Sequence, residues 1–403
     1  MNDILIVGGG VGGLTLALEL KRRGMPHRVF EAAPEIKPVG VGVNLLPHAT
    51  KILAALGLEP ELVRVAVETA ESHFYNRFGQ LIYKEPLGRR AGMDWPQFSI
   101  HRADLQLALL ERAHSVELGK LCVSFEQDAQ RVTLRFADGS SACGAAVIGC
   151  DGIHSALRRQ LVPGEGAPRY SGVNMWRGVT RWPPYLGGAT MVRAGWLATG
   201  KMVIYPIRSH ADGTQLVNWV FEIETPQYRQ WDWNRKARIE DFFAHVALWK
   251  FDWLDIPALL RAADMVLEYP MVDKDPLARW SFGRVTLLGD AAHPMVPRGS
   301  NGAGQAILDA FALADCLQRE RDPVAALAAY EAERLGPTSN VVLENRRNPP
   351  DAILREVYER TGDRPFARIE DVIGDAELRA ISQRYQRVAG YDRDSLERKE
   401  SSR

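Results

Sequence analysis

The chain has 403 residues, of which 46% are apolar and 25% charged, and its 50 basic side chains balance 50 acidic ones. This composition is typical of a globular protein with two or three hydrophobic cores, and it excludes disordered and fibrous chains. With zero net charge, no apolar run of membrane-spanning length and no signal-peptide pattern, we expect a cytoplasmic protein without nucleic-acid partners or membrane insertion; its oligomeric state is left open.

The first segment predicts a strand, a glycine turn and a helix. Residues 3–7 are an apolar run, residues 8–13 read Gly-Gly-Gly-Val-Gly-Gly, and residues 14–23 have helical apolar spacing. A second apolar run, residues 27–30, ends at Glu31. A G-x-G-x-x-G turn in this setting, followed by an acid at this distance, is typical of a dinucleotide-binding βαβ unit.

Each glycine of this turn has a physical role. Gly8 permits the tight turn, Gly10 lets the backbone approach a pyrophosphate, and Gly13 lets the helix pack closely on the strand. The helix N-terminus favours the negative pyrophosphate, and Glu31 can accept hydrogen bonds from a ribose diol. The residues predicted to contact the nucleotide here are Gly8, Gly10, Val11, Gly12, Gly13, Glu31 and Ala32.

Two later segments favour a flavin over a nicotinamide as the bound nucleotide. Residues 147–152 are an apolar strand that breaks at Asp151-Gly152. Residues 285–293 are another buried strand, which delivers Asp290 to its carboxyl end, before a turn that opens a helix near Gly302 and Ala303. A carboxylate can bind a ribityl hydroxyl, while a helix N-terminus can stabilise charge on a reduced isoalloxazine ring.

The three motifs in this order resemble the single-component FAD-dependent aromatic hydroxylases, the family of the p-hydroxybenzoate and salicylate hydroxylases. They are G-x-G-x-x-G with Glu31, Asp-Gly-x-x-Ser-x-x-Arg from Asp151, and Gly-Asp-Ala-Ala-His around Asp290, and they span residues 4–310. Four further stretches resemble the branch that hydroxylates phenazine carboxylates: residues 40–44, 99–102, 175–178 and 269–273.

The resemblance implies an α/β fold in which a Rossmann-like FAD-binding domain is interleaved with a β-sheet substrate domain and followed by C-terminal helices. It also implies that Arg102 and Val43 contact FAD. Asp151 and Arg158 match a motif that handles FAD and pyridine nucleotides, although Asp151 could simply cap the following helix. His293 is expected to be structural. The expected domain limits are 1–71, 99–171 and 282–345 for FAD, 72–98 and 172–281 for the substrate, and 346–403 for the C-terminal helices.

One departure from the family pattern concerns the second turn. The family continues after its motif proline with Gly-x-Gly-x-Asn, whereas alignment on Pro297 places Ser300 at the first glycine and Gly304 at the asparagine. We therefore expect residues 299–304 to hold the flavin with a different backbone geometry.

The region from Gly172 to Ser281 differs in composition from the rest, because it contains nine of the ten tryptophans. Alternating apolar segments within it predict a second sheet, and we expect this sheet to carry a flat aromatic pocket. The predicted substrate contacts are Tyr205, Asn218 and Pro297.

No metal site is expected, because the four cysteines lie far apart and the nine histidines form no H-x-H or H-E-x-x-H motif. There is also no second G-x-G-x-x-G turn for a resident nicotinamide. The resemblance implies that NADH or NADPH docks transiently and reduces FAD, and that dioxygen then gives a flavin C4a-hydroperoxide that an electron-rich ring attacks. The chemistry belongs to the flavin, so no catalytic side chain is predicted.

The predicted function is hydroxylation of a small aromatic or heteroaromatic substrate, such as a phenazine carboxylate or a salicylate. Three alternatives remain open: a flavin oxidase or dehydrogenase, a non-catalytic flavin-binding protein, and a flavin halogenase. The halogenase is disfavoured because residues 231–234, Trp-Asp-Trp-Asn, lack the glycine and the Ile-Pro that flank the halogenase motif.

Overall fold

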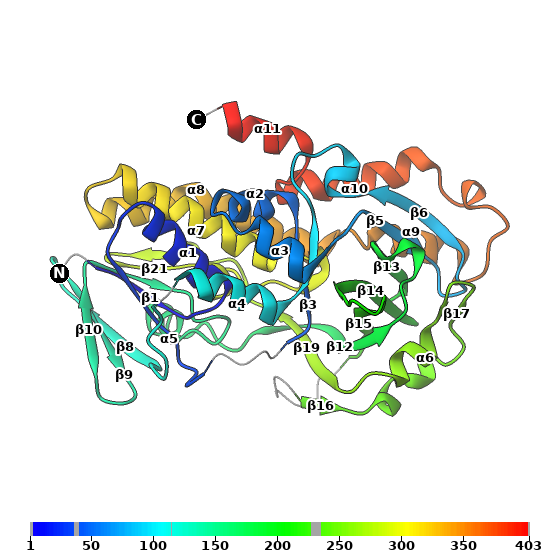
Figure 1. Cartoon of the computed structure of the whole chain (residues 1–403), viewed down its shortest axis with the longest axis horizontal. Coiled ribbons are helices and arrows are strands. Elements are labelled where there is room, and N and C mark those ends of the chain that lie inside the picture. Colours follow the sequence, from blue (N-terminus) through cyan, green and yellow to red (C-terminus); the bar gives the residue numbers. More distant parts are fainter. Residues whose placement is uncertain (1–2, 36–39, 114, 227–234, 402–403) are drawn as a thin grey trace.

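The structure is a computed structural model that describes residues 3–35, 40–113, 115–226 and 235–401. Two bodies of secondary structure lie along the long axis, a small parallel sheet near the N-terminus and a large antiparallel sheet at the other end (Figure 1). The halogenase-like residues 231–234 lie outside the described part. Within the described part, no helix is both long and apolar enough to cross a membrane.

The parallel sheet has the strand order β2-β1-β11-β21-β20, and only β20 runs antiparallel to its neighbour. Its strands are apolar on both sides because helices and loops cover both faces, as parallel sheets require. The strands are β1 (Ile4–Val7), β2 (His27–Phe30), β11 (Ala146–Gly149), β20 (Ser281–Phe282) and β21 (Val285–Leu287).

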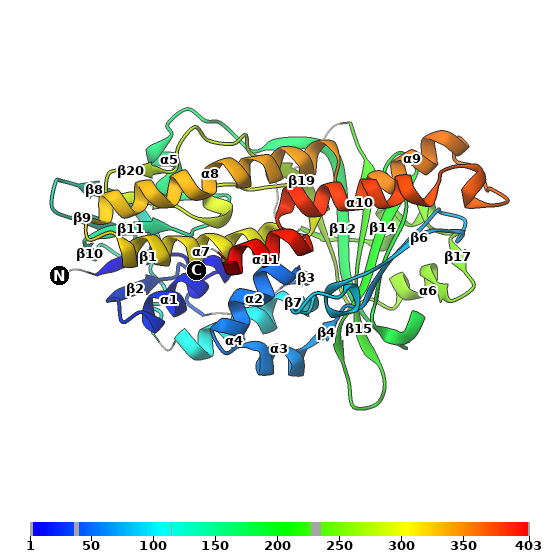
Figure 2. The ribbon, with the colours of Figure 1, turned by 90° about the horizontal axis from the view of Figure 1, so that it is seen from above.

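The helices of this half begin where the strands end. The helix α1 (Val11–Arg22) follows β1 directly, and α7 (Gly302–Arg319) begins fifteen positions after β21. The helix α8 (Pro323–Arg347) lies against α7, and both run along the long axis of the molecule (Figure 2). The other helices of this half are α2 (Pro47–Ala55), α3 (Glu59–Val65), α4 (Arg102–Ala113) and α5 (Ala156–Leu161).

Two three-stranded sheets complete the N-terminal half. The sheet β3-β7-β4 adjoins helices α2 to α4, and the sheet β10-β9-β8 lies near α5. Their strands are β3 (Gly42–Leu45), β4 (Ala66–Glu68), β7 (Phe98–His101), β8 (Cys122–Gln127), β9 (Val132–Phe136) and β10 (Ser141–Gly144).

The large sheet has the order β16-β19-β12-β15-β14-β13-β5-β6 and is antiparallel except where β5 pairs with β13. The chain enters it twice, first with β5 and β6 and again with β12 to β19, so the two halves are interleaved. Its strands are β5 (Glu71–Tyr75), β6 (Leu81–Pro86), β12 (Arg169–Trp182), β13 (Thr190–Trp196), β14 (Gly200–Ser209), β15 (Gln215–Glu224), β16 (Arg235–Ala237) and β19 (Val266–Asp273).

The two faces of the large sheet have different neighbours. Alternation along β14 places Ile204 in an aromatic core with Trp219 and Phe221, whereas Val203 and Tyr205 point to the opposite face. The aromatic core is closed by α6 (Ile256–Arg261) and by the short hairpin of β17 (Lys250–Phe251) and β18 (Leu254–Asp255). Most of the tryptophans in the described part of this region are therefore core residues.

The C-terminal helices α9 (Ala352–Thr361), α10 (Asp375–Ala389) and α11 (Arg393–Ser401) extend from the end of α8 over the large sheet and back toward α2 (Figure 2). A buried ion-pair cluster fixes this segment to the sheet, because Asp351 pairs with both Arg193 and Lys201. The expected α/β architecture, with an interleaved β-sheet body and C-terminal helices, is confirmed.

Candidate functional site

A cavity of about 370 Å³ lies where the two halves meet. It is lined by the turn before α1, by β3, by the start of α4, by the end of β21, by the turn before α7 and by two side chains of the large sheet. Of the predicted residues, Gly10, Val11, Gly12, Val43, Arg102, Asp290, Gly302, Ala303, Tyr205 and Pro297 line it. The segments singled out in the sequence therefore face one cavity.

The first glycine turn is packed against backbone. A Cβ atom on Gly8, whose φ is +111°, would lie 2.3 Å from the carbonyl oxygen of Cys150, and one on Gly13 would lie 2.0 Å from that of Gly8. A Cβ on Gly12 would meet the Leu288 side chain at 2.7 Å. Gly10 differs, because no atom lies within 4 Å of its Cβ position. The open space above Gly10 is where an approaching pyrophosphate would fit.

Glu31 ends β2 and braces this turn. Its Oε2 accepts a hydrogen bond from the Gly9 N–H at 2.7 Å, and its Oε1 accepts one from the Ala33 N–H at 2.8 Å. A carboxylate has about four acceptor positions, so two remain for a ribose diol. Ala32 is exposed and does not line the cavity.

The second turn presents a helix N-terminus to the same cavity. Ser300 adopts a left-handed conformation with φ +54° and ψ +31°, which is the conformation that glycine takes most easily. Asn301 follows as the N-cap of α7, and its Oδ1 lies 3.1 Å from Nε2 of His48. Ser300, which stands at the family's first glycine in the alignment on Pro297, thus takes a backbone conformation suited to glycine.

Two exposed polar side chains, Asp290 and Arg102, complete the cavity wall. Asp290 is exposed at the end of β21, and a Cβ on Gly302 would lie 3.9 Å from its Oδ1. Arg102 begins α4, and one turn later Gln106 donates from Nε2 to the Gly9 carbonyl at 2.8 Å. Sequence reasoning missed Gln106, although its position one helical turn after Arg102 was a usable signal.

The Asp-Gly segment contributes backbone rather than carboxylate to the cavity wall. Cys150 and Gly152 line the cavity, whereas Asp151 accepts from the Ala156 N–H in the first turn of α5 at 2.8 Å. Burial raises the pKa of the Asp151 carboxyl above its ordinary value, and its second oxygen has no hydrogen-bond partner among the described residues. The structure therefore shows the helix contact that the sequence left open, at a helix whose N-cap residue is Ser155, and cofactor binding by Asp151 stays a prediction.

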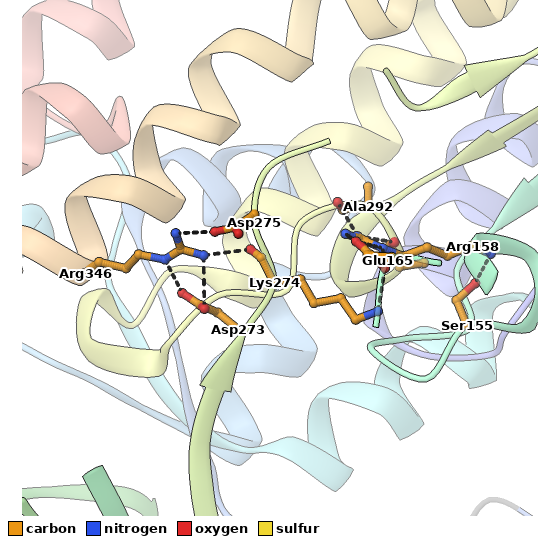
Figure 3. Close-up of polar contacts among 9 residues, drawn as sticks. Ser155, Arg158, Glu165, Asp273, Lys274, Asp275, Ala292 and Arg346 are labelled. Atoms are coloured by element: carbon orange, nitrogen blue, oxygen red, sulfur yellow. Dashed lines mark hydrogen bonds and ion pairs between the residues drawn. The ribbon is translucent and has the colours of Figure 1, made fainter. Parts of the chain in front are cut away.

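Arg158 fixes the strand end that carries Asp290. Its buried guanidinium donates to the carbonyl oxygens of Ala291 and Ala292, at 2.9 and 2.7 Å, and pairs with Glu165 (Figure 3). Lys274 pairs with the same carboxylate at 2.5 Å. Arg158 thus holds the backbone of the Gly-Asp-Ala-Ala segment in position.

His293 is buried in an ion-pair cluster below the cavity. Its Nε2 contacts Asp309, which also accepts from Arg334 at 2.9 Å. Although burial opposes ionisation, His293 and Arg334 hold the pKa of Asp309 below its ordinary value. This arrangement agrees with a structural histidine.

Three side chains of the large sheet converge on one glycine of β3. The Tyr205 hydroxyl donates to the Gly42 carbonyl at 2.9 Å, Arg177 donates to the same oxygen at 2.8 Å, and Asn218 accepts from the Gly42 N–H at 2.7 Å. A Cβ on Gly42 would lie 2.7 Å from the Tyr205 ring and 2.8 Å from Asn218. Asn218 therefore supports the cavity wall from behind, whereas Tyr205 and Arg177 line it.

The aromatic lining is smaller than expected. Among the described residues that line the cavity, Tyr205 is the one aromatic side chain, and no tryptophan takes part. The lining residues that sequence reasoning did not select are Gly42, Asn44, Cys150, Gly152, Arg177, Leu288, Gly289, Met295, Ser300, Asn301 and Ala306. The sequence did contain a signal for three of them, because Gly42, Asn44 and Arg177 lie within the stretches that resemble the phenazine-carboxylate branch.

The donor set of the cavity fits FAD. Two helix N-termini, at α1 and α7, offer N–H groups and favourable dipoles, and the Asp290 carboxylate lines the cavity at the end of β21. Glu31 is not among the lining residues and stands beside the first turn, where it accepts from the Gly9 N–H. The open approach at Gly10 suits a pyrophosphate. Among the described residues, no group of three or more His, Cys, Asp or Glu side chains is arranged to hold a metal ion.

Comparisons with known proteins agree with this site. Residues 1–344 match the family model described as "FAD binding domain". The chain is 39% identical to the phenazine 1,6-dicarboxylic acid hydroxylase PhzS of Lysobacter antibioticus, over 96% of this chain and 97% of the relative. It is 33% identical to the 3-hydroxybenzoate 6-hydroxylase of Polaromonas naphthalenivorans, over 85% and 86%. A crystal structure of a Klebsiella pneumoniae HpxO variant with FAD superposes with a TM-score of 0.75 and 27% identity, over 96% and 94% of the two chains.

Proposed function

The chain belongs to the family of FAD-dependent aromatic monooxygenases, and we propose that it hydroxylates a carboxylated aromatic or heteroaromatic ring at the cavity shared by Gly10, Asp290 and Tyr205. FAD is its cofactor, and the family takes its electrons from NADH or NADPH. The observation that carries the proposal is the cavity itself, because it joins the predicted nucleotide turn to side chains of the large sheet.

The proposed FAD contacts follow from this geometry. The turn at Gly10 and the N-terminus of α1 would hold the pyrophosphate, with the guanidinium of Arg102 beside it. Glu31 would bind the ribose diol, and Asp290 would bind the ribityl chain. The N-terminus of α7, at Gly302 and Ala303, would stabilise negative charge on the ring system.

Bound FAD supplies the activation of dioxygen, and the protein orients the ring and keeps water out. Arg177, Tyr205 and Asn218 perform part of this task because they hold β3 against the large sheet through Gly42. Pro297 and Met295 face the cavity from the opposite wall. We propose that the substrate ring lies between Tyr205 and Pro297.

The two cited relatives support a carboxylated substrate, since their names describe a phenazine dicarboxylic acid and a hydroxybenzoate.

The remaining proposals are a transient NAD(P)H partner, dioxygen as co-substrate, and a division into residues 1–71, 99–171 and 282–345 for FAD and 72–98 and 172–281 for the substrate. We also propose a cytoplasmic location, because the four cysteines are free, as is usual in a reducing compartment.

The direct test is a panel of aromatic acids and phenazines. We expect purified protein to carry a flavin spectrum, to oxidise NADH or NADPH faster when its substrate is added, and to yield a product that has gained one oxygen atom by mass spectrometry. NAD(P)H oxidation that never produces an oxygenated ring would support an oxidase or dehydrogenase instead. A protein that takes up no added FAD would contradict the proposal altogether.

A further inference from the structure

The wall of the flavin cavity contains a partly buried positive charge without a counter-charge. Three charged side chains line the cavity, and Arg177 is half-buried whereas Arg102 and Asp290 are exposed. Arg177 forms no ion pair with any carboxylate of the described residues, and its Nε is buried without a hydrogen-bond partner among them. A cation that is partly withdrawn from water without a counter-charge costs free energy, so Arg177 is suited to an anionic group of a ligand.

The fold holds this guanidinium in a fixed place. Arg177 lies on β12, inside the large sheet, and pairs with Val220 of β15 on one side and Leu267 of β19 on the other. Its Nη2 donates to the Gly42 carbonyl at 2.8 Å, and the Tyr205 hydroxyl donates to the same oxygen at 2.9 Å. The charge is therefore in position before a ligand arrives, which is the arrangement that stabilises a developing charge best.

The position of Arg177 associates it with the ring system of FAD. The pyrophosphate is proposed to lie at Gly10 and the ribityl chain at Asp290, both in the half that contains the parallel sheet. Arg177 reaches the cavity from the large sheet, beside Tyr205, and it contacts the residue that precedes Val43. Val43 lines the cavity, and the family resemblance implies that it contacts FAD.

The ring system gains a negative charge in every reaction cycle. NADH or NADPH transfers a hydride to FAD, so the ring gains two electrons and one proton, the nicotinamide leaves oxidised, and the reduced ring is an anion. A low-dielectric site disfavours this anion unless a positive group stands near it. A hydrogen bond from a guanidinium to an anion is also stronger than one between neutral groups.

We propose that Arg177, together with the N-terminus of α7, stabilises the negative charge of reduced FAD and so favours hydride transfer into the cavity. This inference rests on the proposed function, since it assumes that FAD occupies the cavity with its ring toward the large sheet. An anionic group of the substrate could also pair with this guanidinium, and the experiment separates the two partners.

The experiment measures the reduction potential of the FAD-loaded protein, equilibrated with a reference dye in the absence of oxygen and substrate, and the affinity of the apoprotein for oxidised FAD. Arg177→Gln removes the charge and Arg177→Lys retains it. Tyr205→Phe removes the other donor to the Gly42 carbonyl without a change of charge. Arg181→Gln is the matched control, because this exposed arginine lies on the same face of β12 and pairs with Asp212.

We expect Arg177→Gln to weaken the binding of reduced FAD at least about tenfold more than that of oxidised FAD, because a hydrogen bond to a charged group is lost. For a two-electron couple, a tenfold change lowers the potential by about 30 mV. The ratio of the two affinities should change less than about threefold in Arg177→Lys, Tyr205→Phe and Arg181→Gln. If Arg177→Gln does not fold, Arg177→Met replaces it with the same expectation.

Four results would overturn the inference. An unchanged potential in neutral variants that retain FAD would leave Arg177 with the support of β3 alone. Equal weakening of oxidised and reduced FAD, or loss of both, would assign it to FAD binding in general. An equal shift in Arg177→Lys would mean that the shape of the guanidinium matters and its charge does not.

The fourth result is an unchanged potential combined with weaker binding of phenazine-1-carboxylate, which would assign Arg177 to an anionic group of the substrate. Failure of the proposed function looks different. The wild type would then take up and reduce FAD without yielding an oxygenated product, whatever the potentials of the variants.

Discussion

The turns before α1 and α7 both present a helix N-terminus to the flavin cavity, but different kinds of atoms restrict their glycines. In the first turn, the closest neighbours of Gly8 and Gly13 are backbone atoms of the turn itself and of Cys150. In the second, a Cβ on Gly299 would lie 1.6 Å from the Tyr385 hydroxyl, which arrives from α10. Backbone atoms therefore restrict Gly8 and Gly13 in the first turn, and a side chain restricts Gly299 in the second.

The largest effect should come from Gly13→Ala, because its Cβ would meet the Gly8 carbonyl oxygen at 2.0 Å. We expect a loss of about 3 kcal/mol in the free energy of unfolding, measured in urea. Gly10→Ala in the same turn is the control and should cost less than about 1 kcal/mol. Equal stability of the two variants would contradict this view of the first turn, since backbone contacts would then not restrict Gly13.

Gly10→Val should separate binding from folding. The position is open, so the fold should be retained, but the branched side chain would occupy the approach of the pyrophosphate. We expect FAD affinity to fall more than about 100-fold, or about 2.7 kcal/mol, as followed by flavin fluorescence. A yellow, active variant would show that the pyrophosphate does not lie at Gly10.

Asp290→Ala tests the strand end beside the second turn. The side chain is exposed, so stability should hardly change, whereas loss of a charged acceptor should weaken FAD binding by about 1.5–3 kcal/mol. The measurement is FAD retained after dialysis, with Asp290→Asn as the milder companion. Retention at the wild-type level would remove Asp290 from the site.

Asp151→Asn tests the segment that packs on the first turn, through the pH dependence of the free energy of unfolding. Burial raises the pKa of Asp151, so the native wild type binds its proton more tightly than the unfolded chain and loses stability as pH rises through the raised pKa. Asparagine keeps an acceptor for the Ala156 N–H without titrating. The variant should therefore gain stability relative to the wild type as the pH rises above the ordinary carboxyl range of about 4. A difference that shrinks with rising pH would contradict the buried cap.

The smallest effect is expected from Ser300→Gly. Glycine adopts the φ of +54° without steric cost but loses more entropy on folding, so the two contributions nearly cancel. Unfolding free energy should change by less than about 1 kcal/mol. A larger loss would mean that the serine hydroxyl itself stabilises the second turn.

Much of the flavin half was predictable from the sequence because its constraints are local. The strand, turn and helix around Gly10 follow from apolar periodicity and glycine spacing, and the strand that delivers Asp290 follows from its apolar run. The roles of Asp151 and Arg158 were less predictable. A carboxylate before a helix can cap or bind, and the partners of Arg158 are carbonyls more than 130 positions away.

The substrate half was harder to predict because contacts between distant segments decide which side chains face the cavity. An aromatic pocket was expected on this sheet, but burial of large aromatic rings is more favourable in the core behind the sheet, where Trp219 and Phe221 lie. Gln106 and Arg177 act through backbone carbonyls of other elements, and no periodicity in their own segments encodes that contact.

The attachment at Gly42 has a consequence for protein engineering. Since Tyr205 and Asn218 leave no room for a side chain on Gly42, the large sheet and β3 form one inseparable unit. A chimera that exchanges the large sheet for that of a homologue to alter selectivity must therefore bring its own β3 along. A chimera that takes β3 and the large sheet from different proteins should assemble poorly, even if both parent proteins are stable.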